Sequence, residues 1–391
     1  MAYYNFQTNP NREDTNAEKY TLKQQLFGTD DLLPAWVADM DIETPPFVLE
    51  AVQKRLAHSI VGYEEMPKSA FEMQCRWMQK QHNLAISTDN LLYSHSVVAS
   101  MRVAIEAFSQ KGDGVVVFTP VYPPFFHSVI ELERKLVSSA LKQDSDGRYS
   151  FDMKDFRSKI DADTKLLLLC SPHNPVGRVW SKEELEEILQ ICKEKNIVVF
   201  ADEIHSDLVF APHKHTPFCS LVGAKELCVT AIGVGKTFNM AGFAISSVLI
   251  EDVQLKERFT KAYNRVHFAQ GSVLSHVAFE SAYKEGEEWL EQLKEHLWGN
   301  YLRLRALCEE FEDLVKLTPL EGTYLAWLDC RGMGLRDKKL REFFVKEAKL
   351  GLSAGISFSR EGSGFMRLNF GVSYDTMTEI LYRLENGLRG F

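Results

Sequence analysis

Five side chains that are suited to chemistry on a small ligand follow apolar stretches of the sequence. They are Tyr122, Asn174, Asp202, His205 and Lys236. A lysine amine can attack a carbonyl group or take up a proton, and a carboxylate can hold a cationic ring nitrogen. An aromatic ring can stack on a flat ligand. The set predicts chemistry on an organic ligand, and no metal site is predicted.

Lys236 lies in the stretch AIGVGKTFNMAG, residues 231–242, whose Gly-Lys-Thr also occurs in phosphate-binding P-loops. A P-loop has a further glycine six residues before its lysine, and that position here is Thr230. The lysine also lies too far past the preceding apolar run for the usual tight loop. We therefore interpret Lys236 as a lysine that carries a cofactor, not as a nucleotide-binding residue.

The elements that position these side chains follow from the apolar pattern. Residues 165–170 are apolar after the initial Lys165, as expected of a strand buried on both faces. A helix is predicted to begin at Ser181, which forms a capping box with Glu184, and to end at Asn196. A second buried strand follows in IVVFAD, residues 197–202. A helix between two such strands predicts a parallel βαβ unit.

Further apolar runs occur at 114–120 and 227–233, so the middle of the chain is predicted to be α/β. In an open parallel sheet, ligands bind beyond the carboxyl ends of the strands. The ring, amide, carboxylate and lysine would meet there, where they suit a flat, cationic heteroaromatic aldehyde. Taken singly, each residue also fits a structural role, such as a turn for Asn174, a helix cap for Asp202 or a core position for His205.

The pattern changes from about Phe279 to long charged helices, followed by a strand, another helix near 337–349 and a short strand. This pattern predicts a separate α+β domain. We expect an N-terminal arm or part of the small domain at 1–40, a large domain at 41–283 and a small domain at 284–391.

Composition excludes several classes of partner. The 391 residues contain 45 Lys+Arg against 54 Asp+Glu, a formal charge of -9, so nucleic acid is not an expected partner. No apolar run is long enough for a membrane span. The seven cysteines are scattered and form no C-x-x-C, which predicts reduced thiols in a cytoplasmic protein.

Several blocks of the sequence carry a resemblance to a known family. They are LPAWVADMDIETP, VGYEEMP, SPHNPVGRVWSKEEL, ADEIHSDLVF, HKHTPFCSL, GKTFNMAG and GFMRLNFG. Over essentially the whole chain the sequence resembles the fold-type I pyridoxal-phosphate enzymes of the class I/II aminotransferase superfamily, and more narrowly the MalY/PatB group of cystathionine β-lyase-like carbon–sulfur lyases. The resemblance implies an α/β large domain with a mostly parallel seven-stranded sheet covered by helices, and a smaller α+β domain.

The resemblance also implies roles around a pyridoxal 5'-phosphate cofactor. Lys236 is the lysine that forms the Schiff base, and Asp202 pairs with the pyridine nitrogen. Asn174 and His205 lie near the phenolic oxygen, and His205 stands where many aminotransferases have tyrosine. Tyr122 stacks on the ring and borders the substrate.

Other implied roles concern the cofactor phosphate and the substrate. Backbone N–H groups around Val97 and Val98 receive the phosphate at a helix N-terminus. Tyr63 reaches that phosphate from a second subunit, which implies a homodimer with shared active sites. Arg367 binds the substrate carboxylate as a bidentate fork, assisted by the backbone near Ala38.

The sequence departs from many relatives at the phosphate. Those relatives have serine three residues before the lysine and arginine eight after it, whereas this chain has Gly233 and Ala244. Gly235 also replaces the commoner serine directly before the lysine. Loss of an Arg–phosphate pair removes charge-assisted hydrogen bonds worth roughly 1.5 to 3 kcal/mol each. We therefore expect phosphate binding to depend more on the helix N-terminus and on Tyr63.

The function implied by the resemblance is β-elimination from a sulfur-containing amino acid, such as L-cystathionine or a cysteine S-conjugate, to a thiol, pyruvate and ammonia. An aminotransferase is the alternative enzyme, because both reactions begin with the same deprotonation. The MalY-like resemblance also leaves open a regulatory binding protein, for which the sequence gives no independent support.

Overall fold

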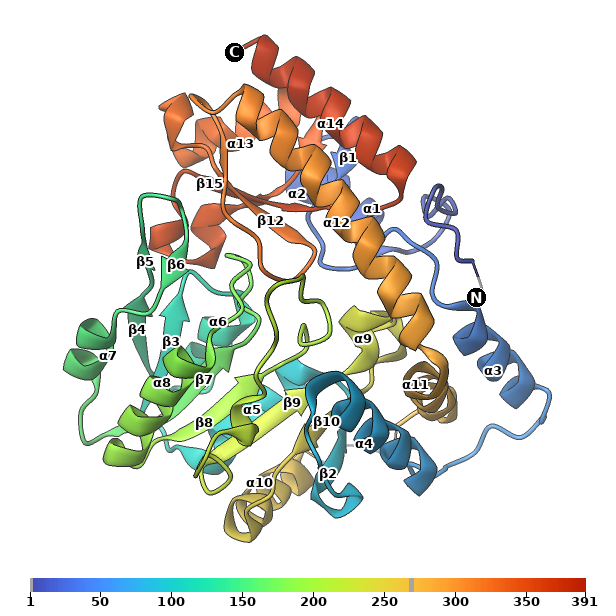
Figure 1. Cartoon of the computed structure of the whole chain (residues 1–391), viewed down its shortest axis with the longest axis vertical. Helices are drawn as coiled ribbons and strands as arrows, with labels where there is room; N and C mark the ends of the chain where they lie inside the picture. The colour runs from blue at the N-terminus through green and yellow to red at the C-terminus, as the bar shows by residue number, and fades with distance from the viewer. Residues whose placement is uncertain (1–2, 267–270) are drawn as a thin grey trace.

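A seven-stranded sheet forms the centre of the larger part of the protein (Figure 1). The computed structural model describes residues 3–266 and 271–391. The strand order is β2-β10-β9-β8-β7-β3-β4, and β10 runs antiparallel to both of its neighbours while the other pairs are parallel. The strands are β2 (Leu91–Ser94), β3 (Gly114–Thr119), β4 (Lys135–Ala140), β7 (Thr164–Cys170), β8 (Val198–Asp202), β9 (Cys228–Ile232) and β10 (Ser246–Leu249). The predicted mostly parallel sheet is confirmed.

Helices cover both faces of this sheet, because successive side chains of the central strands are apolar on both sides. In β7, Leu166 and Leu168 join one core cluster, and Leu167 and Leu169 join the other. The first cluster includes α5 (Val97–Phe108), α6 (Pro124–Glu131) and α10 (Val253–Arg265). The second includes α4 (Lys68–His82), α7 (Met153–Lys159), α8 (Lys182–Lys195) and α11 (Val273–Glu285).

The connection between β7 and β8 has the predicted local structure. The Ser181 hydroxyl accepts a hydrogen bond from the Glu184 N–H at 3.2 Å, and the Ser181 N–H donates to Glu184 Oε2 at 2.8 Å. This capping box begins α8, and Asn196 ends it in the left-handed conformation at φ 54. The parallel βαβ unit predicted from these signals is confirmed.

A second, antiparallel sheet lies in the upper half of Figure 1, with the order β11-β12-β15-β14. Its strands are β11 (Lys316–Leu317), β12 (Leu325–Asp329), β14 (Ser353–Ala354) and β15 (Phe365–Asn369). The helices of this part are α12 (Glu287–Glu310), α13 (Asp337–Lys346) and α14 (Tyr374–Arg389). The predicted strands and helices of the C-terminal part are present, and the domain boundaries at 40 and 283 stay a prediction.

The N-terminal segment contacts the C-terminal part before the chain enters the larger one. Strand β1 (Leu33–Pro34) pairs in parallel with β13 (Leu350–Gly351). The remaining short elements are α1 (Glu18–Thr21), α2 (Lys23–Phe27), α3 (Pro46–Leu56), β5 (Lys142–Gln143), β6 (Tyr149–Ser150) and α9 (Val234–Thr237). Among the described residues, no helix combines the length and the apolar character needed to cross a membrane.

Candidate active site

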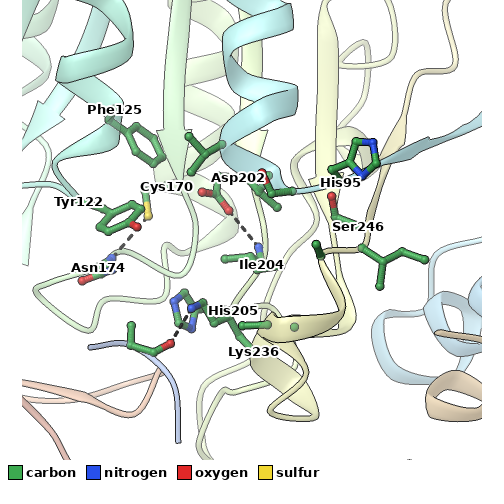
Figure 2. A pocket seen from close by; sticks show the side chains of 18 residues that line it. His95, Tyr122, Phe125, Cys170, Asn174, Asp202, Ile204, His205, Lys236 and Ser246 are labelled. Carbon is green, nitrogen blue, oxygen red and sulfur yellow. Dashed lines mark hydrogen bonds between the residues drawn. The ribbon is translucent and has the colours of Figure 1, made fainter. Parts of the chain in front are cut away.

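A cavity of about 230 Å³ lies at the carboxyl ends of the parallel strands, where the topology predicts a ligand site. Figure 2 shows polar side chains from the ends of different strands around it. All of the predicted site residues line this cavity except Tyr63 and Arg367. Those that line it are Ala38, Val97, Val98, Tyr122, Asn174, Asp202, His205 and Lys236.

Lys236 lies in the single turn of α9, which begins directly after β9. Its amine donates a hydrogen bond to the Ala38 carbonyl oxygen at 2.5 Å. Burial lowers the pKa of the Lys236 amine to about 8, and the carboxylates of Asp39 and Asp202 oppose the shift. A lysine with this pKa is partly uncharged near neutral pH, so it can act as a nucleophile and as a base.

Asp202 is the last residue of β8, and 7% of its surface is exposed. One carboxylate oxygen accepts a hydrogen bond from the Ile204 N–H at 3.1 Å. The described part of the chain gives this carboxylate no salt-bridge partner within 4.0 Å. Burial therefore raises the pKa of Asp202 to about 7, although the Ile204 N–H and Lys236 oppose the change. A cationic group on a ligand could pair with this carboxylate.

His205 and Asn174 border the same cavity. Burial, assisted by the positive charges of Lys236 and Arg367, lowers the pKa of His205 to about 3, so its ring is neutral. Its Nδ1 atom has no hydrogen-bond partner among the described residues. Asn174 follows β7, and its backbone carbonyl accepts a hydrogen bond from the Tyr122 N–H at 3.1 Å. This bond fixes Tyr122 beside the cavity (Figure 2).

Arg367 comes from β15 of the second sheet and is 4% exposed. Its guanidinium donates to Asn174 Oδ1 at 3.1 Å and to the Trp36 carbonyl at 2.6 Å. Its Nε atom has no partner in the part of the chain that the structure describes. Burial lowers the pKa of Arg367 to about 10, which leaves it charged at neutral pH. A buried guanidinium bonded only to neutral groups is suited to bind a carboxylate from a ligand.

The chain segment around Ala38 is held from both parts of the protein. The Ala38 carbonyl accepts from Lys236 and also from the Tyr324 hydroxyl, at 2.7 Å. Asn369 donates to the Val37 and Asp39 carbonyls, and Asn239 donates to the Met40 and Ile42 carbonyls. We did not predict these contacts from the sequence. Asn239 lies three residues after Lys236 in GKTFNMAG, and its left-handed φ of 51 is the only local sign of its role.

Tyr63 is not brought to the cavity by this chain. It lies between α3 and α4 in a segment without regular secondary structure, and 93% of its surface is exposed. Its predicted contact with the phosphate depends on a second subunit and stays a prediction.

A family model for aminotransferase class I and II matches residues 37–384. The chain belongs to this family. The match confirms the predicted superfamily, and the matched residues include both sheets and the residues that line the cavity. Among the described residues of this family member, no group of three His, Cys, Asp or Glu side chains is arranged to hold a metal ion.

Relatives and solved structures in this family agree with the narrower resemblance. Cystathionine beta-lyase PatB of Bacillus subtilis (strain 168) is 36% identical over 98% of this chain and 100% of its own length. The structure of cystalysin from Treponema denticola, which contains pyridoxal 5'-phosphate, matches at TM-score 0.96 and 32% identity over 100% of both chains. The pyridoxal-phosphate-bound C–S lyase from Staphylococcus hominis matches at TM-score 0.91 and 32% identity, over 99% of this chain and 98% of its own.

The buried groups of this family member fit a ligand of defined chemistry. Within residues 3–266 and 271–391, Asp202 has no salt-bridge partner, the Nδ1 atom of His205 has no hydrogen-bond partner, and the Arg367 guanidinium has no anionic partner. A protonated ring nitrogen, a phenolic oxygen and a carboxylate supply these missing partners. The amine of Lys236 stands between them as the group that can form a covalent bond.

Proposed function

We propose that this protein is a pyridoxal 5'-phosphate-dependent carbon–sulfur β-lyase. It cleaves a sulfur-containing amino acid, such as L-cystathionine or a cysteine S-conjugate, to a thiol, pyruvate and ammonia. The observation that carries the proposal is the buried Lys236 amine beside the unpaired Asp202 and Arg367, in a chain 36% identical to a cystathionine β-lyase.

Named residues hold the cofactor in this proposal. Lys236 binds it covalently, Asp202 keeps a proton on its ring nitrogen, and Tyr122 stacks on the ring. Asn174 and the neutral His205 meet its phenolic oxygen, where hydrogen bonds tune acidity. When bound, pyridoxal phosphate supplies an electron sink conjugated to the substrate's α-carbon.

Lys236 and Arg367 act on the substrate. Arg367 and the backbone N–H groups near Ala38 orient the carboxylate, so that the α-hydrogen faces the Lys236 amine. Once the substrate's amino group has replaced it at the cofactor, the Lys236 amine is free to take up the α-proton, for which a pKa lowered to about 8 is well matched. The resulting ammonium then gives a proton to the departing sulfur as the β-carbon–sulfur bond breaks. The remaining 2-aminoacrylate is hydrolysed by water to pyruvate and ammonia.

Substituting Arg367→Lys tests the carboxylate contact. A lysine keeps the charge but loses the planar fork, so kcat/KM for cystathionine should fall roughly 10- to 100-fold, mainly through KM. Steady-state assays of pyruvate release measure both constants. Arg331→Lys is the matched control, because Arg331 is an exposed arginine paired with Asp329 outside the cavity. An unchanged KM in Arg367→Lys would remove Arg367 from the substrate site.

The alternative within the same family is an aminotransferase, in which Lys236 returns the proton to the cofactor. The decisive assay supplies L-cystathionine, cystine or an S-alkylcysteine without any 2-oxo acid. A β-lyase releases pyruvate and a thiol continuously under these conditions. An aminotransferase stops after a single turnover and resumes only when a 2-oxo acid is added, and that result would contradict the proposal.

Two further properties belong to the same proposal. We propose a homodimer with shared active sites. Exposed apolar side chains between α3 and α4 support it, because 67% of Ile60, 62% of Val61 and 93% of Tyr63 is exposed. In this arrangement Tyr63 approaches the partner's phosphate. We also propose a cytoplasmic location, because all seven cysteines are free thiols.

A further inference from the structure

One end of the cavity lies near the two positions at which this chain lacks the side chains found on the phosphate in many relatives. This end is lined by the N-terminus of α5, by Ala244 and by Ser246 at the start of β10, and Gly233 lies next to Ser246. The phosphate of the proposed cofactor requires donors here, and neither Gly233 nor Ala244 has a side chain that could donate. Other groups near this end of the cavity must therefore supply the hydrogen-bond donors.

A side chain at Gly233 would have to displace its neighbours. A Cβ atom built at this position would lie 2.8 Å from Ile204 Cδ1 and 3.1 Å from Ser246 Cβ. Contacts this short force a neighbour to move. The side chains of Ile204 and Ser246 therefore occupy the space that a serine side chain would need at position 233.

Ser246 is well placed to supply the missing hydroxyl. It is the first residue of β10, it is 2% exposed, and it lines the cavity. Its hydroxyl donates to the Ser94 carbonyl at 3.3 Å, which is long for an O–H donor. Because a hydroxyl rotates freely, it can turn to a phosphate oxygen and form a shorter, charge-assisted bond.

His95 lines the same end of the cavity. Ser94, the residue before it, is the pairing partner of Ser246, so His95 and Ser246 stand close together, as Figure 2 shows. The Tyr93 hydroxyl lies 2.8 Å from His95 Nδ1. When the hydroxyl donates to Nδ1, the ring proton resides on Nε2, which makes this nitrogen a donor. In this tautomer the His95 ring can donate a hydrogen bond to an anion.

The helix completes the set of donors. In α5, the Ser96 hydroxyl caps the Ala99 N–H at 3.1 Å, so the N–H groups of Val97 and Val98 are left to a ligand. The helix dipole favours an anion at this position. The cavity end therefore combines backbone N–H groups with one hydroxyl and one imidazole.

We propose that Ser246 and His95, with the N-terminus of α5, bind the cofactor phosphate in this chain, and that Gly233 leaves the space beside it to Ser246 and Ile204. The proposal rests on the proposed function for the presence of the cofactor. It assigns phosphate binding to a strand serine and a histidine in place of a serine and an arginine from the lysine loop.

The test compares two ligands that differ only in the phosphate. Cofactor-free protein is titrated with pyridoxal 5'-phosphate and with pyridoxal, and binding is followed by absorbance and by quenching of tryptophan fluorescence. We expect Ser246→Ala to weaken pyridoxal phosphate binding about 5- to 10-fold and His95→Ala about 10-fold or more. The affinity for pyridoxal should change less than about twofold in both.

Ser247→Ala is the matched control, since Ser247 follows Ser246 in β10 but bonds Gln74 away from the cavity. It should leave the ratio of the two affinities unchanged. Gly233→Ser should weaken pyridoxal phosphate binding even though it adds a hydroxyl, because the new Cβ displaces Ser246. Equal weakening of both ligands in Ser246→Ala and His95→Ala, or none, would overturn the inference. Failure of the unmodified protein to bind pyridoxal phosphate would instead overturn the proposed function.

Discussion

Replacing Lys236 with alanine should reduce pyruvate release from L-cystathionine by at least about 10³-fold. The expected loss is large because one amine performs several tasks in the proposed mechanism: it binds the cofactor covalently, takes the α-proton and protonates the departing sulfur. No other described lysine lines the cavity, so no second amine can substitute for it. The rate of pyruvate formation at saturating cofactor and substrate measures the effect.

Absorbance spectra separate loss of chemistry from loss of the cofactor. The unmodified protein should show a band near the visible edge that borohydride removes while fixing the cofactor to the chain. Lys236→Ala should bind pyridoxal phosphate without this covalent link. A small primary amine added to the variant should restore a fraction of the activity, because it can take the α-proton in place of the lysine.

The control for this substitution is Lys225→Ala. Lys225 is an exposed lysine that pairs with Glu251, outside the cavity. Its removal should leave both the spectrum and the turnover unchanged. If Lys236→Ala retained a tenth or more of the activity, Lys236 would not be the base, and the proposed roles of the cavity residues would have to be reassigned.

Features that are local in sequence could be predicted well. Asn174, Asp202 and Lys236 follow the apolar runs of β7, β8 and β9, and parallel strands bring their carboxyl ends to one edge. The strand order was not needed for this inference. The capping box of Ser181 and the helix end at Asn196 could likewise be read from the local pattern.

Features that depend on distant segments could not be predicted. Ser246 approaches Gly233 only because β10 runs antiparallel along β9. The spacing of apolar residues in the sequence does not indicate such a contact. The carbonyl groups from Trp36 to Ile42 similarly meet donors from positions 236, 239, 324, 367 and 369. A backbone acceptor has no signature in its own residue type, so a sequence pattern cannot show which donors will reach it.

Contacts between distant segments also determine which charged side chains near the cavity are paired. Lys19 is fully buried and contacts Asp39 and Asp41, each at 3.0 Å, while Arg12 bonds the same two carboxylates. These pairs fix the segment next to Ala38 and neutralise its acidic residues. Asp202 and Arg367 have no such partners in the described structure, and burial shifts both of their pKa values toward the neutral forms. The contrast supports the proposal that ligands supply the partners of Asp202 and Arg367.

Substituting Asp202→Asn should lower the rate of pyruvate formation by about 10²- to 10³-fold, with a much smaller change in KM. The amide keeps the shape and the hydrogen bond from the Ile204 N–H but cannot hold a positive charge on the ring nitrogen. Steady-state assays give both constants. Asp375→Asn, which changes a carboxylate on the exposed surface that bonds Gln7, is the matched control and should behave like the unmodified protein.

An isotope effect distinguishes this electrostatic role from a structural one. Without the Asp202 charge the α-carbanion is less stable, so removal of the α-proton becomes slower than the steps that follow it. Cystathionine deuterated at the α-carbon should therefore give a larger kinetic isotope effect in Asp202→Asn than in the unmodified protein. A variant that was merely misfolded would lose active molecules and leave the isotope effect unchanged. Activity within about twofold of the unmodified protein would show that a buried carboxylate with a pKa raised to about 7 does not hold the ring proton at all.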